Sequence, residues 1–113
     1  MQIYGTRKCI KTKKAERFFR DRGISYHFVD LGERPLSRGE LENIKQKIAD
    51  ESLIDTESPI YKKKGMSYIE YDEIEELLEN ALLMRTPIVR EQSAVIVGDN
   101  EKEWKNLADR LKT

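Results

Sequence analysis

Residues 3–15 read Ile3-Tyr4-Gly5-Thr6-Arg7-Lys8-Cys9-Ile10-Lys11-Thr12-Lys13-Lys14-Ala15. The apolar run that ends at Tyr4 is typical of a short strand, and Gly5 interrupts it. A helical pattern follows, and its apolar face includes Ala15. Cys9, the only cysteine of the chain, therefore lies at or just before the first turn of a helix.

This position favours the ionised form of the cysteine. The first backbone N–H groups of a helix lack partners within the helix, and the helix dipole adds partial positive charge there, so a thiolate is stabilised. Five of the eight residues in the range 7–14 are basic, which further stabilises a thiolate or a bound anion. Thr12 can offer its hydroxyl to the sulfur or to the anion. We predict that Cys9 is a reactive residue with a lowered pKa.

A free cysteine is also often a small buried apolar residue, and lysines that follow it often form only a solvated helix face. Arg7 and Lys8 directly precede Cys9, and two charged side chains argue against a sealed apolar niche. The local sequence therefore favours an accessible thiol over a buried one.

Length and composition indicate a single domain that spans residues 1–113. Basic and acidic residues balance at 21 each, so the zero formal charge argues against a general polyanion binder. No aromatic residues interleave with the short basic cluster, and nucleic-acid binding is not expected. A single cysteine excludes an internal disulfide, and no apolar run reaches membrane-spanning length. With no signal-peptide core after Met1, the expected location is a reducing cytoplasm.

The first unit of the chain reads strand, helix, strand. Residues 2–4 form the first strand, residues 10–22 a helix that ends at Gly23, and residues 25–30 a second strand. Such a unit pairs its strands in parallel through a right-handed crossover. His27, the only histidine, has no metal-ligand partner by spacing, so we expect no metal site and a structural or solvent-facing role.

Residues 36–84 have helical character and are interpreted as an insertion that forms a lid or subdomain. Ser37 and Glu40 make a capping box for a helix that extends to about Ala49. The pair Ser58-Pro59 predicts the start of a second, short helix.

The third helix of the insertion begins at Asp72, which caps it together with Glu75. Its predicted apolar stripe consists of Ile74, Leu77, Leu78, Ala81 and Leu82. The chain then returns to strands, and residues 88–97 form a hairpin with its turn at residues 91–93. A final helix follows Asn100. Its predicted apolar face consists of Trp104, Leu107, Ala108 and Leu111.

A βαβ unit, a helical insertion and a ββα unit make an α/β chain of the thioredoxin-like (glutaredoxin-like) fold, with a four-stranded mixed sheet. Several motifs stand in order along the chain, namely Tyr4-Gly5, Cys9-Ile10-Lys11-Thr12-Lys13-Lys14-Ala15, Leu53-Ile54-Asp55-Thr56, Tyr61-Lys62-Lys63-Lys64-Gly65-Met66 and Leu83-Met84-Arg85-Thr86-Pro87-Ile88-Val89-Arg90. In these motifs the chain resembles the arsenate reductase (ArsC) and Spx-related family of thioredoxin-fold proteins over essentially its full length. The third and fourth motifs are similar to the family's helical segment.

The resemblance implies a cis Thr86-Pro87 peptide bond that faces Cys9. A trans proline that merely opens an edge strand is the alternative. The resemblance also implies that Cys9 is the catalytic thiolate, with no bound cofactor, with glutathione as co-substrate and with glutaredoxin as a partner that regenerates the thiol. The residues expected to bind an anion or substrate are Lys8, Thr12, Lys13, Arg85, Thr86 and Arg90.

The family's arginines are only partly matched. Arsenate reductases of this type carry arginines near position 55, immediately before the cis-proline and in the following hairpin, where this chain has Asp55, Thr86 and residues 95–98. Arg85 and Arg90 are near enough in sequence to substitute, and each can equally be an ordinary surface charge. A carboxylate beside an arsenate dianion is unfavourable, which argues against arsenate as the substrate.

Two alternatives to an arsenate reductase-like thiol oxidoreductase therefore stay open. One is a glutathione-dependent reductase of a non-arsenate substrate, such as an oxidised thiol. The other is an Spx-like regulator that binds the RNA polymerase alpha subunit. The redox-sensing form of that regulator needs a second cysteine, and Thr12 occupies its place here.

Overall fold

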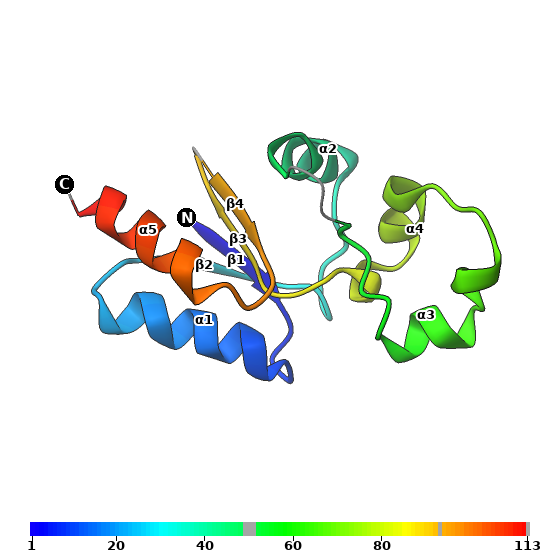
Figure 1. Ribbon diagram of the computed structural model, residues 1–113, viewed down its shortest axis with the longest axis horizontal. Coiled ribbons are helices and arrows are strands. Elements are labelled where there is room, and N and C mark those ends of the chain that lie inside the picture. The colour runs from blue at the N-terminus through cyan, green and yellow to red at the C-terminus, as the bar shows by residue number, and fades with distance from the viewer. Residues whose placement is uncertain (49–51, 93, 113) are drawn as a thin grey trace.

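The computed structural model describes residues 1–48, 52–92 and 94–112. Its elements are β1 (Gln2–Gly5), α1 (Ile10–Asp21), β2 (His27–Asp30), α2 (Arg38–Lys47), α3 (Pro59–Lys63), η1 (Met66–Tyr68), α4 (Glu73–Glu79), η2 (Ala81–Leu83), β3 (Ile88–Glu91), β4 (Ala94–Val97) and α5 (Glu101–Leu111). The strands form one sheet in the order β2-β1-β3-β4 (Figure 1). β1 pairs in parallel with β2, whereas β1 with β3 and β3 with β4 are antiparallel. The predicted four-stranded mixed sheet is confirmed.

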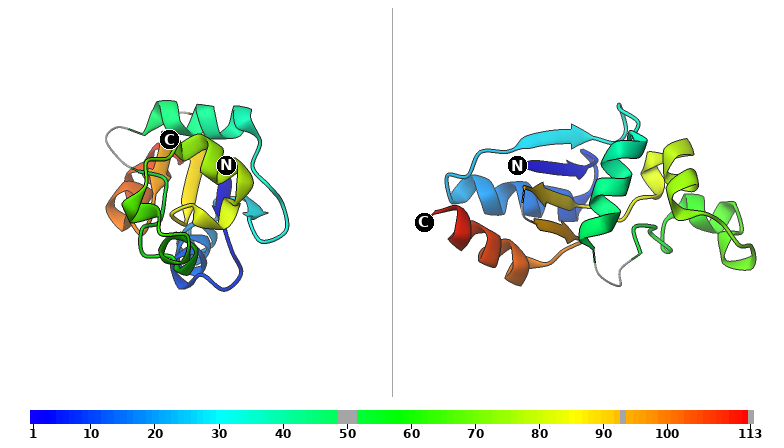
Figure 2. Two further views of the ribbon diagram at one scale, coloured as in Figure 1. Left: turned by 90° about the vertical axis from the view of Figure 1, so that its right-hand side faces the viewer. Right: turned by 90° about the horizontal axis from the view of Figure 1, so that it is seen from above.

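Helices cover both faces of this sheet (Figures 1 and 2). Neighbouring residues of a strand point to opposite faces, so Ile3 packs toward α1 and α5 while Tyr4 packs toward α2. The core on the α1/α5 face consists of Ile3, Ala15, Phe18, Phe19, Val89, Ile96, Trp104, Leu107 and Ala108. The sheet thus carries two apolar cores, one on each face.

The insertion extends the molecule along one axis, to 46 Å against 27 and 23 Å along the other two. Helices α3 and α4 lie at the end farthest from the C-terminus (Figure 1). Ile54 pairs with Met84 in an isolated β-bridge, and the N–H of Arg85 donates to the carbonyl of Leu53 at 2.6 Å. The middle of the insertion, at Leu53 and Ile54, is therefore joined to its end, and the residues around Ile54 are extended rather than helical.

The predicted caps are present. Ser37 Oγ accepts from the N–H of Glu40 and the Glu40 carboxylate accepts from the N–H of Ser37, each at 3.1 Å. Ser58 caps α3, and Asp72 Oδ1 accepts from the N–H of Glu75 at 3.0 Å. These caps confirm all three helix starts of the insertion. The expected helix end at Ala49 and the turn residue Ser93 lie outside the described residues.

Other boundaries differ from the prediction. The second strand begins at His27, because Gly23, with φ of 69°, and Ile24 still complete the end of α1. The stripe predicted through Leu82 is interrupted, since Asn80 Oδ1 accepts from the N–H of Leu82 at 3.1 Å and starts a separate 3-10 turn. Leu82 is 45% exposed as a result, and Leu111 at the end of α5 is 40% exposed.

No helix in the described part of the chain is both long and apolar enough to cross a membrane.

Candidate active site

Cys9 is the N-cap residue of α1. Its backbone is extended, with φ of −79° and ψ of 115°, and its carbonyl accepts from the N–H of Lys13 at 3.1 Å. The N–H of Cys9 donates to the carbonyl of Thr6 at 3.2 Å, which closes the turn after β1. The first turn of α1 contains no acidic residue. The sulfur therefore lies at the positive end of a helix, as predicted.

The nearest polar neighbour of the sulfur comes from the far end of the chain. Cys9 Sγ and Thr86 Oγ1 are 3.2 Å apart and form a hydrogen bond. The Thr86-Pro87 peptide bond is cis, which confirms the prediction from the family resemblance. Thr86 ends the connection from the insertion into β3, so the thiol lies where the insertion meets the sheet.

The surroundings of the thiol lower its pKa. Burial raises the pKa of Cys9, but the hydroxyls of Thr12 and Thr86 and the backbone N–H groups of Thr12 and Lys11 lower it by more. The Thr86 hydroxyl is within hydrogen-bonding distance of the sulfur, whereas Thr12 Oγ1 has no hydrogen-bond partner among the described residues. Cys9 is only partly buried, so its thiolate is accessible to a reagent.

Thr12 is completely buried beneath the turn that leads to Cys9. A Cβ atom added to Gly5 would collide with Thr12, including its Cβ atom at 2.9 Å. Gly5 thus leaves room for Thr12 to approach the strand end, which explains the Tyr-Gly pair before the cysteine. Because Thr12 is fully buried and its Oγ1 has no hydrogen-bond partner among the described residues, its expected role in binding an anion stays a prediction.

The basic residues around Cys9 do not all face it. Arg7 Nε pairs with Asp30 Oδ2 at 3.2 Å, and Lys14 Nζ pairs with Asp99 Oδ2 at 3.1 Å. Lys8 and Lys13 were both predicted to bind the substrate. Their side chains are exposed, and their role in binding stays a prediction.

Arg85 and Arg90 lie in different places. Arg85 lines a pocket next to Thr86, and its Nη1 donates to the carbonyl of Ser52 at 3.4 Å. Arg90 instead donates to the hydroxyl of Tyr4 and to Asn43 Oδ1, each at 2.9 Å, on the α2 face of the sheet. The structure therefore brings Arg85 to the site, but the expectation that Arg90 joins it is wrong, because Arg90 faces α2 at the other end of β3.

Two hollows meet at Thr86. The first is charged and is lined by Lys11, Asp55, Arg85, Thr86, Gly98 and Asp99. The second is largely apolar and is lined by Thr6, Leu31, Asp55, Glu57, Ser58, Pro59, Ile60, Ala81, Leu82, Met84 and Thr86. Lys11 and Asp99 were not predicted as site residues. The position of Lys11 two residues after Cys9 was the available signal, whereas nothing in the sequence indicated Asp99.

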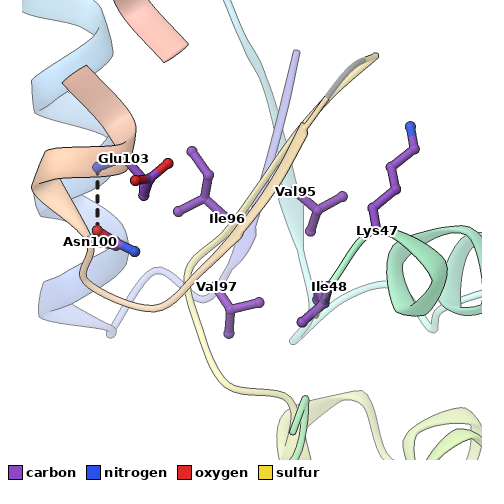
Figure 3. Close-up of a pocket in the computed structure, with 7 residues that line it drawn as sticks. All are labelled: Lys47, Ile48, Val95, Ile96, Val97, Asn100 and Glu103. Carbon is purple, nitrogen blue, oxygen red and sulfur yellow. Dashed lines mark hydrogen bonds between the residues drawn. The ribbon is translucent and has the colours of Figure 1, made fainter. Parts of the chain in front are cut away.

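A third hollow, along β4, has a different character. Figure 3 shows Val95 and Val97 on the side of Ile48 and Ile96 on the side of Glu103. It contains no cysteine, and the Cys9 site shares none of its residues. It is therefore a gap at the edge strand rather than a second candidate active site.

The described residues hold no group of three or more histidine, cysteine or carboxylate side chains that could bind a metal ion. His27 is exposed on the edge strand β2.

A model of the ArsC family matches residues 4–107, which include Cys9 and the Thr86-Pro87 bond. The chain belongs to the ArsC family. It is 32% identical over 118 residues to the Global transcriptional regulator Spx 2 of Lactococcus lactis, and this alignment covers 96% of this chain and 86% of the relative. It is 28% identical over 116 residues to the Spx 2 regulator of Oceanobacillus iheyensis, covering 97% of this chain and 84% of the relative.

Solved structures of ArsC proteins share the fold of this family member. An ArsC family related protein from Bacteroides fragilis superimposes with a TM-score of 0.82 at 20% identity, covering 94% of this chain and 97% of that one. Arsenate reductase from Vibrio cholerae gives a TM-score of 0.79 at 18% identity, with the same coverage. The thioredoxin-like fold predicted from the sequence is confirmed.

Proposed function

We propose that this ArsC family member is a single-thiol reductase in which the Cys9 thiolate attacks an oxidised sulfur. The observation that carries the proposal is the 3.2 Å contact between Cys9 Sγ and Thr86 Oγ1 at the start of α1. A partly exposed thiol with a lowered pKa supplies more thiolate near neutral pH than an ordinary cysteine does.

The proposed reaction begins with a mixed disulfide between a substrate thiol and glutathione. The Cys9 thiolate attacks the glutathione sulfur, a Cys9–glutathione disulfide forms, and the substrate leaves as a thiolate. The substrate thiol is thereby reduced and Cys9 is oxidised. A second glutathione, as its thiolate, then attacks the adduct and releases Cys9 with formation of glutathione disulfide. Reduced glutaredoxin can take over the adduct in the same way, and an external thiol is required because the chain has no second cysteine.

The charges beside Cys9 support an oxidised thiol rather than arsenate as substrate. The charged hollow combines Lys11 and Arg85 with two carboxylates, Asp55 and Asp99. The charges of these four side chains balance, so the hollow offers an arsenate dianion no net positive charge, whereas glutathione carries an ammonium group as well as carboxylates. This reaction also needs a reduced thiol, so we place the protein in a reducing cytoplasm.

The test is formation and release of a glutathione adduct on Cys9. Reduced protein is mixed with glutathione disulfide near neutral pH, and intact mass is expected to increase by one glutathione. Added glutathione and glutaredoxin are expected to reverse the increase, and the Cys9→Ser variant is expected to show neither change. A parallel assay replaces the disulfide with arsenate and measures arsenite. Absence of an adduct from the folded protein contradicts the proposal, and arsenite production as fast as adduct turnover would instead favour arsenate.

A second candidate function is transcriptional regulation through the RNA polymerase alpha subunit. Its support is the 32% identity to an Spx regulator of which the alignment covers 86%. With Thr12 in place of a second cysteine, such binding would not depend on an internal disulfide. The purified alpha subunit is expected to retain both the wild-type protein and Cys9→Ser in a pull-down if this candidate is correct. No retention of either protein removes it.

A further inference from the structure

The largely apolar hollow forms a groove, here named the apolar groove. It runs from Thr6, in the turn before Cys9, to Pro59 and Ile60 of the insertion. Two threonines lie at its Cys9 end, Thr6 before the cysteine in the chain and Thr86 in contact with its sulfur. Six of the eleven lining residues are apolar, namely Leu31, Pro59, Ile60, Ala81, Leu82 and Met84. A ligand atom that reaches the sulfur over Thr86 can therefore continue onto apolar surface.

Two large apolar side chains near the site are exposed, one in the groove wall and one next to Cys9 in the chain. Ile10, directly after Cys9, is 81% exposed, and Leu82 in the groove wall is 45% exposed. A single exposed apolar residue is ordinary on a protein surface. Here Leu82 belongs to a groove that includes Thr86, the residue in contact with the sulfur, and Ile10 directly follows Cys9 in the chain, so a substrate whose disulfide is attacked by Cys9 can contact both.

The charged hollow shares the same threonine. Thr86 and Asp55 line both hollows, while Lys11, Arg85 and Asp99 belong to the charged one. The site thus presents opposite charges in one hollow and apolar surface in the other, and both hollows include Thr86, which contacts the sulfur.

We infer that the substrate of Cys9 is a polypeptide whose cysteine is joined to glutathione by a disulfide and is flanked by apolar residues. This inference rests on the thiol chemistry proposed above and names its substrate class. The glutathione half matches the charged hollow, where its carboxylates meet Lys11 and Arg85 and its ammonium group meets a carboxylate. The polypeptide half covers the apolar groove. Arsenate covers no apolar surface, and glutathione disulfide has no apolar half to place there.

The chemical step is a thiol–disulfide exchange. Cys9 sulfur bonds to the glutathione sulfur, the disulfide bond to the polypeptide breaks, and the polypeptide cysteine leaves as a thiolate. Free glutathione is the reductant, and glutathione disulfide is the oxidised product.

The test uses two glutathionylated peptides that differ only beside the cysteine, with leucine on both sides in one and serine on both sides in the other. Transfer of glutathione to the full-length protein is measured as kcat/KM for each. We expect the leucine peptide to exceed the serine peptide about tenfold, because leucine side chains lose water-exposed area in the groove.

Variants of the exposed residues locate the effect. Ile10→Ser and Leu82→Ser are each expected to reduce the leucine-to-serine preference by about threefold or more. Leu111→Ser, which changes a residue of similar exposure at the end of α5, is expected to leave the preference unchanged. All three side chains are exposed, so we expect the variants to fold, and circular dichroism checks this.

Equal kcat/KM for the two peptides overturns the inference, as does a preference that Ile10→Ser and Leu82→Ser leave intact. In both cases turnover of glutathione disulfide at Cys9 would still support the reductase proposal. Absence of any Cys9 adduct with every disulfide removes the reductase proposal together with the inference.

Discussion

At the scale of single residues, the site depends on one contact between distant parts of the chain. Thr86 Oγ1 lies 3.2 Å from Cys9 Sγ, and it is one of the groups that lower the pKa of the thiol. A hydrogen bond to a thiolate is charge-assisted and therefore stronger than one to a neutral thiol. We therefore expect Thr86 to affect the reactivity of the thiol as well as the packing.

Replacement of Thr86 by valine is expected to raise the pKa of Cys9, because the hydrogen bond to the thiolate is lost while the side-chain shape is kept. The alkylation rate near neutral pH is expected to fall severalfold, and the midpoint of its pH dependence to move upward. The matched control is Thr56→Val at an exposed position, which should leave the midpoint where it is. An unchanged midpoint in Thr86→Val would show that the other neighbours of Cys9 control its pKa.

The second residue-scale prediction concerns the close approach of Gly5 and Thr12. Gly5→Ala is expected to destabilise the protein by about 1–3 kcal/mol, because the new methyl group overlaps the buried Thr12 side chain. In a Thr12→Ala background the same change should cost clearly less, since the obstructing atoms are gone. Urea unfolding of the four proteins gives the coupling energy. Additive costs would contradict the steric explanation.

At the scale of elements, α2 is joined to the sheet by a polar network. Glu40 of α2 accepts from the Tyr4 hydroxyl at 2.8 Å and from both terminal nitrogens of Arg34, at 3.0 and 2.9 Å. Arg90 of β3 donates to the same hydroxyl. The hydrogen bonds from Arg34 are the main reason that the pKa of Glu40 falls to about 2. This network explains why Arg90 does not reach the candidate site at Cys9.

Acid is therefore expected to weaken the attachment of α2. Because the pKa of Glu40 in the folded state is depressed from 4.5 to about 2, its ionised form contributes stability fully above pH 4.5. That contribution is lost as pH falls from about 4.5 through about 2. We expect the free energy of unfolding to decline across this window by about 2 kcal/mol from this group alone.

The Glu40→Gln variant tests that assignment. It is expected to be about 1–3 kcal/mol less stable than wild type near neutral pH and to lose less stability between pH 4.5 and 2. Glu42→Gln changes an exposed carboxylate of the same helix and serves as the control. If both variants follow the wild-type pH profile, other carboxylates carry the acid dependence.

At the scale of the whole molecule, two apolar cores share one thin sheet. The core on the α1/α5 face includes Trp104, and the core on the α2 face includes Leu77 of the insertion, both completely buried. Alternate residues of β1 and β3 enter opposite cores, so neither can lose its packing without loosening the strands that the other needs. The single domain predicted for residues 1–113 should unfold as a unit.

Leu77→Ala provides the test, because Leu77 lies in the core opposite to the only tryptophan. It is expected to cost about 2–5 kcal/mol and to shift the unfolding midpoint seen by Trp104 fluorescence and by circular dichroism equally. A shift in the circular dichroism midpoint alone would mean that the insertion unfolds separately.

Much of this architecture could be predicted because its signals are local. The break at Gly5 and the helical pattern after it located Cys9 at the start of α1. Serine and aspartate caps located the helices of the insertion, since each cap bonds to a backbone N–H only a few residues away. The interruption at Asn80 was missed, because apolar spacing continues past a residue whose side chain starts a new turn.

The residue pattern was sufficient for the order of helices and strands, for the place of the only cysteine at a helix start and, through its family motifs, for the cis bond before Pro87. Tertiary structure alone showed which of the residues expected near that cysteine lie beside it. Arg85 and Arg90 both follow the insertion closely, but a strand advances about 3.3 Å per residue, so Arg90 lies roughly 13 Å beyond Thr86 and faces α2. The β3-β4 hairpin brings Asp99 to the charged hollow, and the helix break at Asn80 places Leu82 in the wall of the apolar groove. Contacts between residues far apart in the chain depend on strand length and on the face of the sheet to which each side chain points. Neither can be predicted from the spacing of neighbouring residues.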